Sequence, residues 1–177
     1  MQANAVTWAV LGLVAMEPRS GYDVKRIVDK SVRLFWAASY GQIYPELRRL
    51  EAAGWIEGGD EPRGGRSRRV YSITPEGRRE LQKWLHGHET RIELRDESLL
   101  RLFFADALPH EEAVALLRAR REGYRGLLAY LRGLDDGGEP DPPFVDLVYR
   151  WGVDYCEWGI EWCESQERRL VGLLETV

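Results

Sequence analysis

Cysteine, histidine and long apolar runs are all scarce in this sequence. The two cysteines, Cys156 and Cys163, lie in one late segment, which is not the pattern of a disulfide-stabilised secreted domain. The apolar stretch over residues 6–16 is much shorter than the ~20 residues of a membrane span. It also lacks the basic leader and the small-residue cleavage site of a signal peptide. These absences predict a cytoplasmic protein with no membrane partner.

The motifs of common enzyme classes are missing as well. The sequence contains no Walker loop, dinucleotide glycine pattern, nucleophile elbow or His-Glu-x-x-His. Its three histidines, His86, His88 and His110, do not lie beside a plausible nucleophile, and no pair of carboxylates stands out from a solvated surface. We therefore predict that the chain is not an enzyme and carries no cofactor.

What the chain does contain is a charge that changes sign along its length. Residues 1–91 carry 15 Lys or Arg against 11 Asp or Glu, whereas residues 92–177 carry 10 against 18. A basic first half suits a polyanionic partner, and an acidic second half suits solubility or a cationic ligand. With 177 residues, 44% of them hydrophobic, the chain can form one full core or two small ones.

Three helices are predicted at the start of the chain. Residues 5–16 have apolar side chains at helical spacing and end before a proline, and Ser20 is a natural N-cap for a helix over 21–30. The apolar positions of this second helix are Tyr22, Val24, Ile27 and Val28. Ser39 is expected to cap a third helix over roughly 40–53, which Gly54 ends. Its inward-facing residues are Ile43, Leu47 and Leu50.

The next segment changes from helical to β-prone. Residues 55–57 and 70–73 are short β-prone runs, and the residues between them are turn formers and four arginines, which predicts a two-stranded hairpin with a basic tip. Thr74-Pro75-Glu76 then starts a fourth helix that reaches about residue 88. Three helices, a hairpin and a helix, in this order, form a winged helix-turn-helix.

A winged helix lays its third helix in the major groove of DNA while the wing follows the backbone or the minor groove. Glutamine can pair with adenine and arginine with guanine, so Gln42 and Arg48 are candidate base readers. Arginines of the wing would mainly neutralise phosphates. The predicted DNA contacts are Tyr22, Lys25, Ser39, Tyr40, Gln42, Tyr44, Arg48, Arg49, Arg63, Arg66 and Arg68. The expected partner is double-stranded operator DNA.

The second half is predicted to be all-helical, with helices over 97–107, 109–134 and 144–176. Along the last of these, aromatic residues recur on one face. The predicted interface consists of Phe144, Val148, Trp151, Tyr155, Trp158 and Trp162. We favour a dimer interface, because aromatic stripes at helical spacing usually pack. The same residues, with Asp154, Glu157 and Glu161 nearby, could also line a gap that binds a small flat or cationic effector, and both interpretations can hold.

A metal site is not expected. Cys156 and Cys163 are seven residues apart on one helix face, with Glu164 adjacent, and His86 and His88 form a His-x-His near the boundary of the halves. Two cysteines ~10 Å apart along a helix cannot both bind one zinc ion without further ligands. We interpret them as a buried apolar pair.

Several of these motifs resemble the PadR family of transcriptional regulators. The third-helix signature of that family is similar to Ser39-Tyr40-Gly41-Gln42-Ile43-Tyr44-Pro45-Glu46-Leu47-Arg48-Arg49-Leu50 and the residues that follow to Ile56. Leu11-Gly12-Leu13 and residues 20–24 match its opening, and residues 68–77 match its wing strand and fourth helix. One departure is Val70, where many members have a second aromatic residue. The resemblance implies a repressor that a small molecule or another signal releases from its operator, with C-terminal helices that form the dimer.

The sequence therefore predicts a mainly α fold with a small β-hairpin. A winged helix-turn-helix DNA-binding domain over 1–91 would precede an all-α dimerisation and ligand-sensing domain over 92–177. We expect a homodimeric, sequence-specific transcriptional regulator. Two alternatives remain: a winged-helix protein-interaction module, which the arginine-rich wing disfavours, and a DNA-binding regulator that responds to metal or oxidation at the cysteines.

Overall fold

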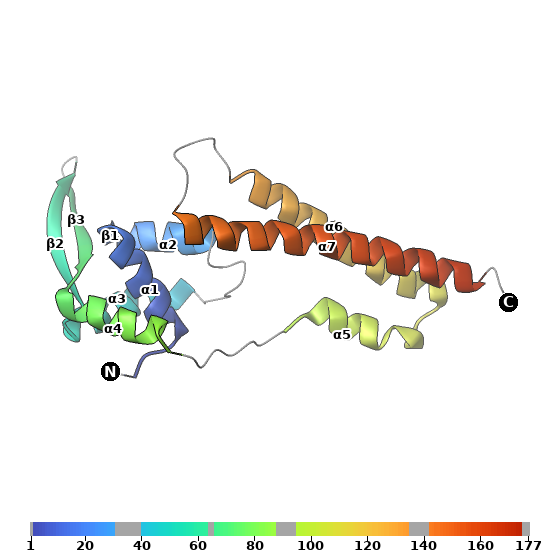
Figure 1. Cartoon of the computed structure of the whole chain (residues 1–177), viewed down its shortest axis with the longest axis horizontal. Coiled ribbons are helices and arrows are strands. Elements are labelled where there is room, and N and C mark those ends of the chain that lie inside the picture. Colours follow the sequence, from blue (N-terminus) through green and yellow to red (C-terminus); the bar gives the residue numbers. More distant parts are fainter. Residues whose placement is uncertain (1, 31–39, 64–65, 88–94, 135–141, 175–177) are drawn as a thin grey trace. The chain divides into compact units, whose positions relative to one another are not determined.

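The computed structural model describes residues 2–30, 40–63, 66–87, 95–134 and 142–174, and Figure 1 shows the order of the elements along the chain. The chain forms two compact units, residues 1–91 and 92–177. The fold is mainly helical with one small antiparallel sheet, as the sequence predicts. No described helix is both long enough and apolar enough to cross a membrane.

The first unit begins with two capped helices, α1 (Ala5–Met16) and α2 (Gly21–Lys30). Asn4 caps α1 by accepting a hydrogen bond from the backbone N–H of Thr7 at 3.1 Å. Ser20 caps α2, as predicted: its Oγ accepts from the Asp23 N–H, and the Asp23 carboxylate accepts from the Ser20 N–H in return. These reciprocal bonds use donors that a helix start leaves unpaired.

The third helix starts later than the sequence pattern predicts. Residues Tyr40–Gln42 form a single 3-10 turn, η2, and the α-helix α3 runs over Ile43–Ala52. Pro45 explains the difference, because proline has no N–H and its ring clashes with the carbonyl four residues earlier. A helix that starts at Ile43 keeps Pro45 in the first turn, where neither effect matters. The chain leaves α3 through Gly54, whose φ of 71° is in the left-handed region.

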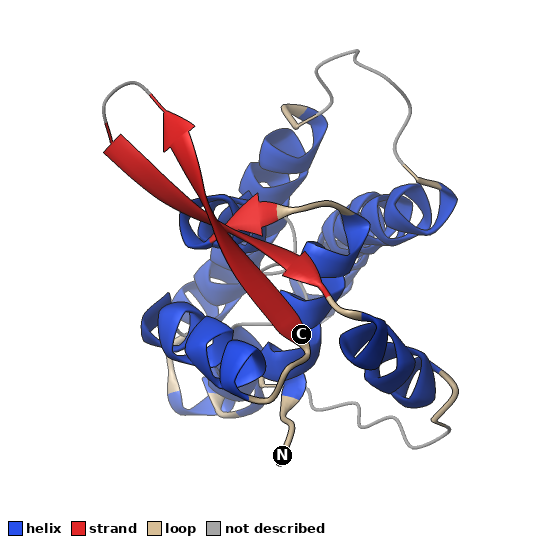
Figure 2. Cartoon of the chain, turned by 90° about the vertical axis from the view of Figure 1, so that its left-hand side faces the viewer, coloured by secondary structure: helices blue, strands red, loops and turns tan. Residues whose placement is uncertain are grey.

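The sheet has three strands rather than two. The predicted hairpin is present as β2 (Ile56–Arg63) and β3 (Arg66–Ile73), and both strands are longer than expected. A two-residue strand, β1 (Arg19–Ser20), adds to the free edge of β3, so that the strand order is β1-β3-β2 (Figure 2). The hairpin register pairs Ile56 with Ile73 at its base.

The core of this unit lies between α1, α2, α3 and the base of the hairpin. Its fully buried members are Val10, Leu11, Val14, Val24, Ile43, Leu47, Leu50 and Ile56. The last helix, α4 (Pro75–Leu85), starts at the predicted cap Thr74, whose Oγ accepts from the Gly77 N–H at 3.0 Å. The indoles of Trp55 and Trp84 stack on Trp8, with ring centroids 5.7 and 5.3 Å apart.

The second unit consists of α5 (Glu97–Phe103), the 3-10 turn η3 (Ala105–Ala107), α6 (His110–Arg132) and α7 (Pro143–Leu174). The predicted helix over 97–107 is thus interrupted at Phe104, where α5 ends and η3 begins.

The helices α6 and α7 pack side by side and antiparallel (Figure 1). Ion pairs show their direction: Arg121 pairs with Glu167 at 2.8 Å, whereas Arg132, further along α6, pairs with Glu157, earlier on α7. Gly159 permits close contact, because a Cβ atom there would lie 2.7 Å from the ring of Tyr124.

Candidate nucleic-acid interface

The outer side of α3 carries residues expected to read DNA. Ile43, Leu47 and Leu50 are buried, as the sequence predicts. Tyr44 and Arg48, four residues apart, therefore lie together on the opposite side of the helix. Tyr44 is 49% exposed, and the Arg48 side chain has no hydrogen bond or ion pair with any residue that the structure describes. Gln42 is exposed at the end of η2, directly before the helix.

A second tyrosine lies next to this surface, on α2. Tyr22 is 65% exposed, so its assignment to the apolar side of α2 was wrong, whereas its assignment to the DNA-contacting set remains a prediction. Gly21 makes room for Tyr44, since a Cβ atom on Gly21 would lie 2.6 Å from the Tyr44 ring. Lys25 is exposed one turn further along α2. We call Tyr22, Lys25, Tyr44 and Arg48 the α2–α3 surface.

Arg49 has a different environment from Arg48. Its guanidinium donates to the buried carboxylate of Glu46 at 2.6 Å and to the backbone carbonyl of Gln2 at 2.9 Å. These contacts hold Arg49 at the edge of α3 that faces the N-terminal segment. The structure therefore gives Arg49 a role in packing and does not bring it into the α2–α3 surface.

Two arginines of the wing also make contacts within the fold. Arg68 pairs with Asp23, the same carboxylate that completes the cap of α2. Arg69 donates to Glu51 of α3 at 2.5 Å, and this hydrogen bond raises the pKa of Arg69. Together the two ion pairs attach the wing to both helices of the helix-turn-helix. The Arg68 side chain is 30% exposed, so part of it still reaches solvent.

The remaining predicted contacts lie at or beyond the limits of the described structure. The side chains of Tyr40, Arg63 and Arg66 are outside the described part, and so is Ser39 as a whole. The backbone places Arg63 opposite Arg66 at the far end of the hairpin, where the strands of the wing end. Their contacts with phosphates therefore remain predictions.

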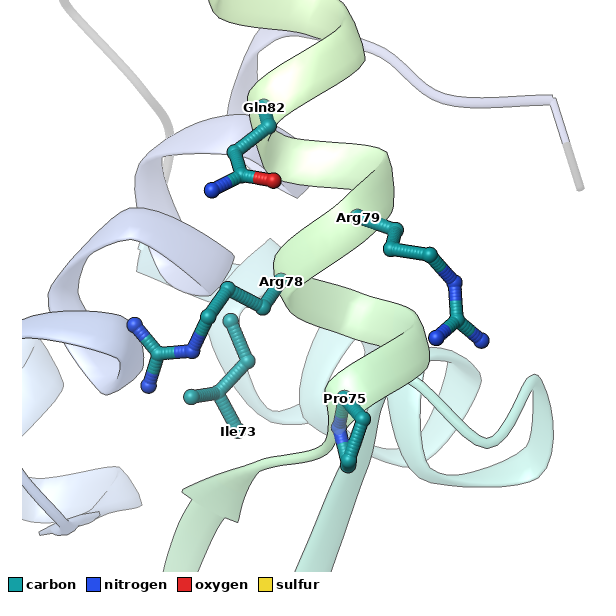
Figure 3. Close-up of a pocket in the computed structure, with 5 residues that line it drawn as sticks. All are labelled: Ile73, Pro75, Arg78, Arg79 and Gln82. Atoms are coloured by element: carbon teal, nitrogen blue, oxygen red, sulfur yellow. The ribbon is translucent and has the colours of Figure 1, made fainter.

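Further positive charge lies on α4, a helix with no residue in the predicted DNA-contacting set. Arg78, Arg79 and Gln82 border a cavity of about 440 Å³, together with Ile73 and Pro75. Arg78 and Gln82 point to one side of α4 and Arg79 to the other (Figure 3). Arg79 is paired with Glu76. This shallow, arginine-lined hollow adds to the basic character of the first unit.

Four rings of the predicted aromatic face of α7 form a continuous row of contacts. The ring of Tyr155 stacks on Trp151 with centroids 5.5 Å apart and on Trp158 at 6.2 Å, and Trp158 contacts Trp162 at 6.4 Å. Trp151 and Trp158 are 54% and 56% exposed, although they are large apolar side chains. Phe144 and Val148, earlier on α7, are exposed as well. We call Phe144, Val148, Trp151, Tyr155, Trp158 and Trp162 the aromatic face.

The two cysteines lie on the other side of α7. Cys156 and Cys163 are free thiols, completely buried against α6, as predicted. Burial raises the pKa of both thiols, so they stay protonated at neutral pH. Within the described ranges, no group of three or more His, Cys, Asp or Glu side chains could hold a metal ion. Thiol-based sensing therefore finds no support in this geometry.

Comparisons with known families match both units. The model of the transcriptional regulator PadR-like family matches residues 10–83, and that of the virulence activator alpha C-terminal family matches residues 94–170. The negative transcriptional regulator PadR of Bacillus subtilis (strain 168) is 32% identical over 132 residues, which cover 73% of this chain and 72% of that protein.

Solved structures of the B. subtilis protein are also similar. PadR in complex with operator DNA superposes with a TM-score of 0.85 at 28% identity, and covers 96% of this chain and 99% of that one. PadR in complex with p-coumaric acid superposes with a TM-score of 0.77 at 26% identity, and covers 96% and 98%. The similarity thus extends over both units.

Proposed function

The chain belongs to the PadR-like family of transcriptional regulators, and from this premise we propose that it acts as a homodimeric repressor that a small molecule releases from its operator. It is a DNA-binding regulator and not an enzyme. The dimer, the repression and the release are the proposed parts. The first unit would bind DNA, and the second would form the dimer and receive the effector.

The α2–α3 surface is the observation that supports DNA reading most strongly. Two tyrosines, a lysine and an arginine stay exposed there, although the neighbouring side chains of α3 are fully buried. In a winged helix this side of the third helix enters the major groove. The operator-bound relative has the same fold at 28% identity. Arg48 would then contact base edges, and Lys25 would neutralise a phosphate.

The aromatic face supports dimerisation. A monomer would expose several indoles and Phe144 to water along one helix, and such continuous apolar patches mark interaction sites. A twofold-symmetric partner that contributes the same face would bury them. Two first units would then present their third helices to successive major grooves, ~34 Å apart.

An aromatic effector is proposed from the same relative, which binds p-coumaric acid. An effector can release DNA only if it binds one arrangement of the dimer better than the other. The interpretation of the aromatic face as a cation site weakens, because the nearby Glu157 is already paired with Arg132 at 2.6 Å. Asp154 and Glu161 stay exposed there.

Selection of bound fragments from genomic DNA tests the proposal. The purified protein should enrich a small set of promoter fragments that share an imperfect palindrome, with half-site centres ~10 base pairs, or a multiple of that, apart. Enrichment of fragments without a shared sequence would contradict a specific operator. Enrichment of single, unpaired half-sites would contradict a DNA-binding dimer.

A further inference from the structure

A second cavity lies entirely within the second unit. It has a volume of about 370 Å³, within the range of ~300–1,000 Å³ that is usual for small-molecule sites. One part of its wall is apolar and belongs to α6: Leu116, Ala119 and Leu127. The other part is polar and includes Ser98, Arg101, Arg120, Tyr124 and Tyr155. Three helices, α5, α6 and α7, thus contribute to one wall.

Arg120 is the main polar group of this cavity, and its side chain is only 7% exposed. Its guanidinium is held by an ion pair with Asp96 at 2.7 Å and by hydrogen bonds to Ser98 and Tyr124. The Nε–H of Arg120 is buried and has no acceptor among the described residues. A buried donor without an acceptor is costly unless a bound group satisfies it.

A phenolic proton is left over in the same place. The Tyr124 hydroxyl accepts from Arg120 and lies 3.4 Å from the Tyr155 hydroxyl. Whichever of the two phenols donates to the other, the second phenol keeps its proton. No acceptor for that proton is found in the described part of the chain. The cavity wall therefore holds an unused phenol O–H next to the Arg120 guanidinium.

The polar groups and shape of the cavity define the ligand class. Arg101 and Arg120 both line the cavity; Arg120 pairs with Asp96, and Arg101 pairs with Glu97 of α5 at 2.6 Å. The ring of Tyr155 and the bare backbone at Gly123 leave room for a flat group, because nothing lies within 4 Å of a Cβ atom added to Gly123. We propose that this cavity binds a small aromatic carboxylate, whose carboxylate accepts from the donors around Arg120 and whose ring lies along α6.

The proposal rests on the proposed function, since it assigns the effector site of the same regulator. The cavity reaches from α5 to Tyr155, and Tyr155 belongs to the aromatic face, with its ring stacked on Trp151 at 5.5 Å. An acid bound in the cavity thus touches a residue of the proposed dimer interface directly. This contact gives the ligand a route to change how two copies pack.

Two glycines of α6 provide a matched pair of variants for the test. Gly123 lines the cavity and Gly126 does not, yet a Cβ atom added to either meets nothing within 4 Å. Gly123→Leu should fill the cavity and Gly126→Leu should not. Both should keep the fold, because leucine favours a helix more than glycine does. Thermal unfolding followed by circular dichroism verifies this.

Calorimetric titration with benzoate, 4-hydroxybenzoate and p-coumarate measures binding, with the neutral amide of p-coumaric acid as the uncharged probe. Wild type and Gly126→Leu should bind at least one acid saturably and bind the amide at least tenfold more weakly. Gly123→Leu should bind that acid at least tenfold more weakly than wild type. Equal affinities of Gly123→Leu and wild type, or no saturable binding of any acid by wild type, would overturn the site.

The same three proteins are titrated with selected DNA in the absence of acid. Retained specific DNA binding together with absent acid binding would refute the cavity site and leave the regulator intact. Loss of specific DNA binding in the wild-type protein would instead refute the proposed function.

Discussion

At the scale of single residues, Arg48 and Arg49 are adjacent and have opposite surroundings. Arg48→Ala should remove a base contact and reduce discrimination between operator and random DNA by about 1–3 kcal/mol. Arg49→Ala should leave that discrimination unchanged and lower the free energy of unfolding by about 1–3 kcal/mol, because it leaves the buried carboxylate of Glu46 without its partner. Competition binding assays and urea unfolding of both variants measure these effects. A larger loss of discrimination in Arg49→Ala would contradict the assignment.

The ion pair of Asp96 and Arg120 predicts a pH effect of known sign. Burial raises the pKa of Asp96, but hydrogen bonds from Ser98 and Arg120 outweigh it, so the folded pKa lies below its ordinary value. Asp96 therefore stabilises the fold above the unfolded pKa of ~3.9, and this stabilisation is lost as pH falls through the folded pKa. The difference in unfolding free energy between wild type and Asp96→Asn should be constant from pH 7 to about 5 and shrink below about pH 4. Urea midpoints across this range would refute the coupling if the difference did not shrink.

At the scale of elements, the start of α4 depends on one glycine. A Cβ atom on Gly77 would lie 2.0 Å from the backbone oxygen of Trp55, so α4 could dock under the wing only after a backbone shift. Gly77→Ala should lower the free energy of unfolding by about 1–3 kcal/mol. Gly12→Ala in α1 is the control, because nothing lies within 4 Å of its added Cβ, and it should be neutral or stabilising. Equal urea midpoints for the two variants would contradict this close packing.

The elements also show how far a sequence alone can predict this fold. The inward side of α3 and the caps Ser20 and Thr74 were predictable, because periodicity and capping act over three or four residues. The strand β1 was missed, since two residues are too few to show alternation. The contact of Arg68 with Asp23 was missed for another reason: the partners are 45 residues apart in sequence. Local patterns do not identify partners at such separations. The contacts of Arg120 with Asp96 and Ser98, at the start of α5, were missed for the same reason.

At the scale of the whole molecule, the aromatic face should set the oligomeric state. Replacing Trp151 and Trp158 with serine should shift the dimer toward monomer, because the proposed interface would lose two large indoles that are exposed in the single chain. A chain that ends after Leu134 lacks α7 and should be monomeric too. Leu85→Ser is the control, since Leu85 is also a large exposed apolar side chain but lies in the first unit. Sedimentation velocity over a range of concentrations measures the equilibrium, and an unchanged dimer in the double variant would contradict the interface.

Sequence-specific DNA binding is the central property on which these assignments depend. Its most direct test is a fluorescence-anisotropy titration of the protein with the DNA upstream of its own gene and with random DNA, at several salt concentrations. We expect tight binding to the upstream DNA, much weaker binding to random DNA, and affinities that fall steeply with salt as counterions are released. Absence of salt-sensitive binding to any DNA would contradict a DNA-binding regulator and favour a winged helix that binds a protein.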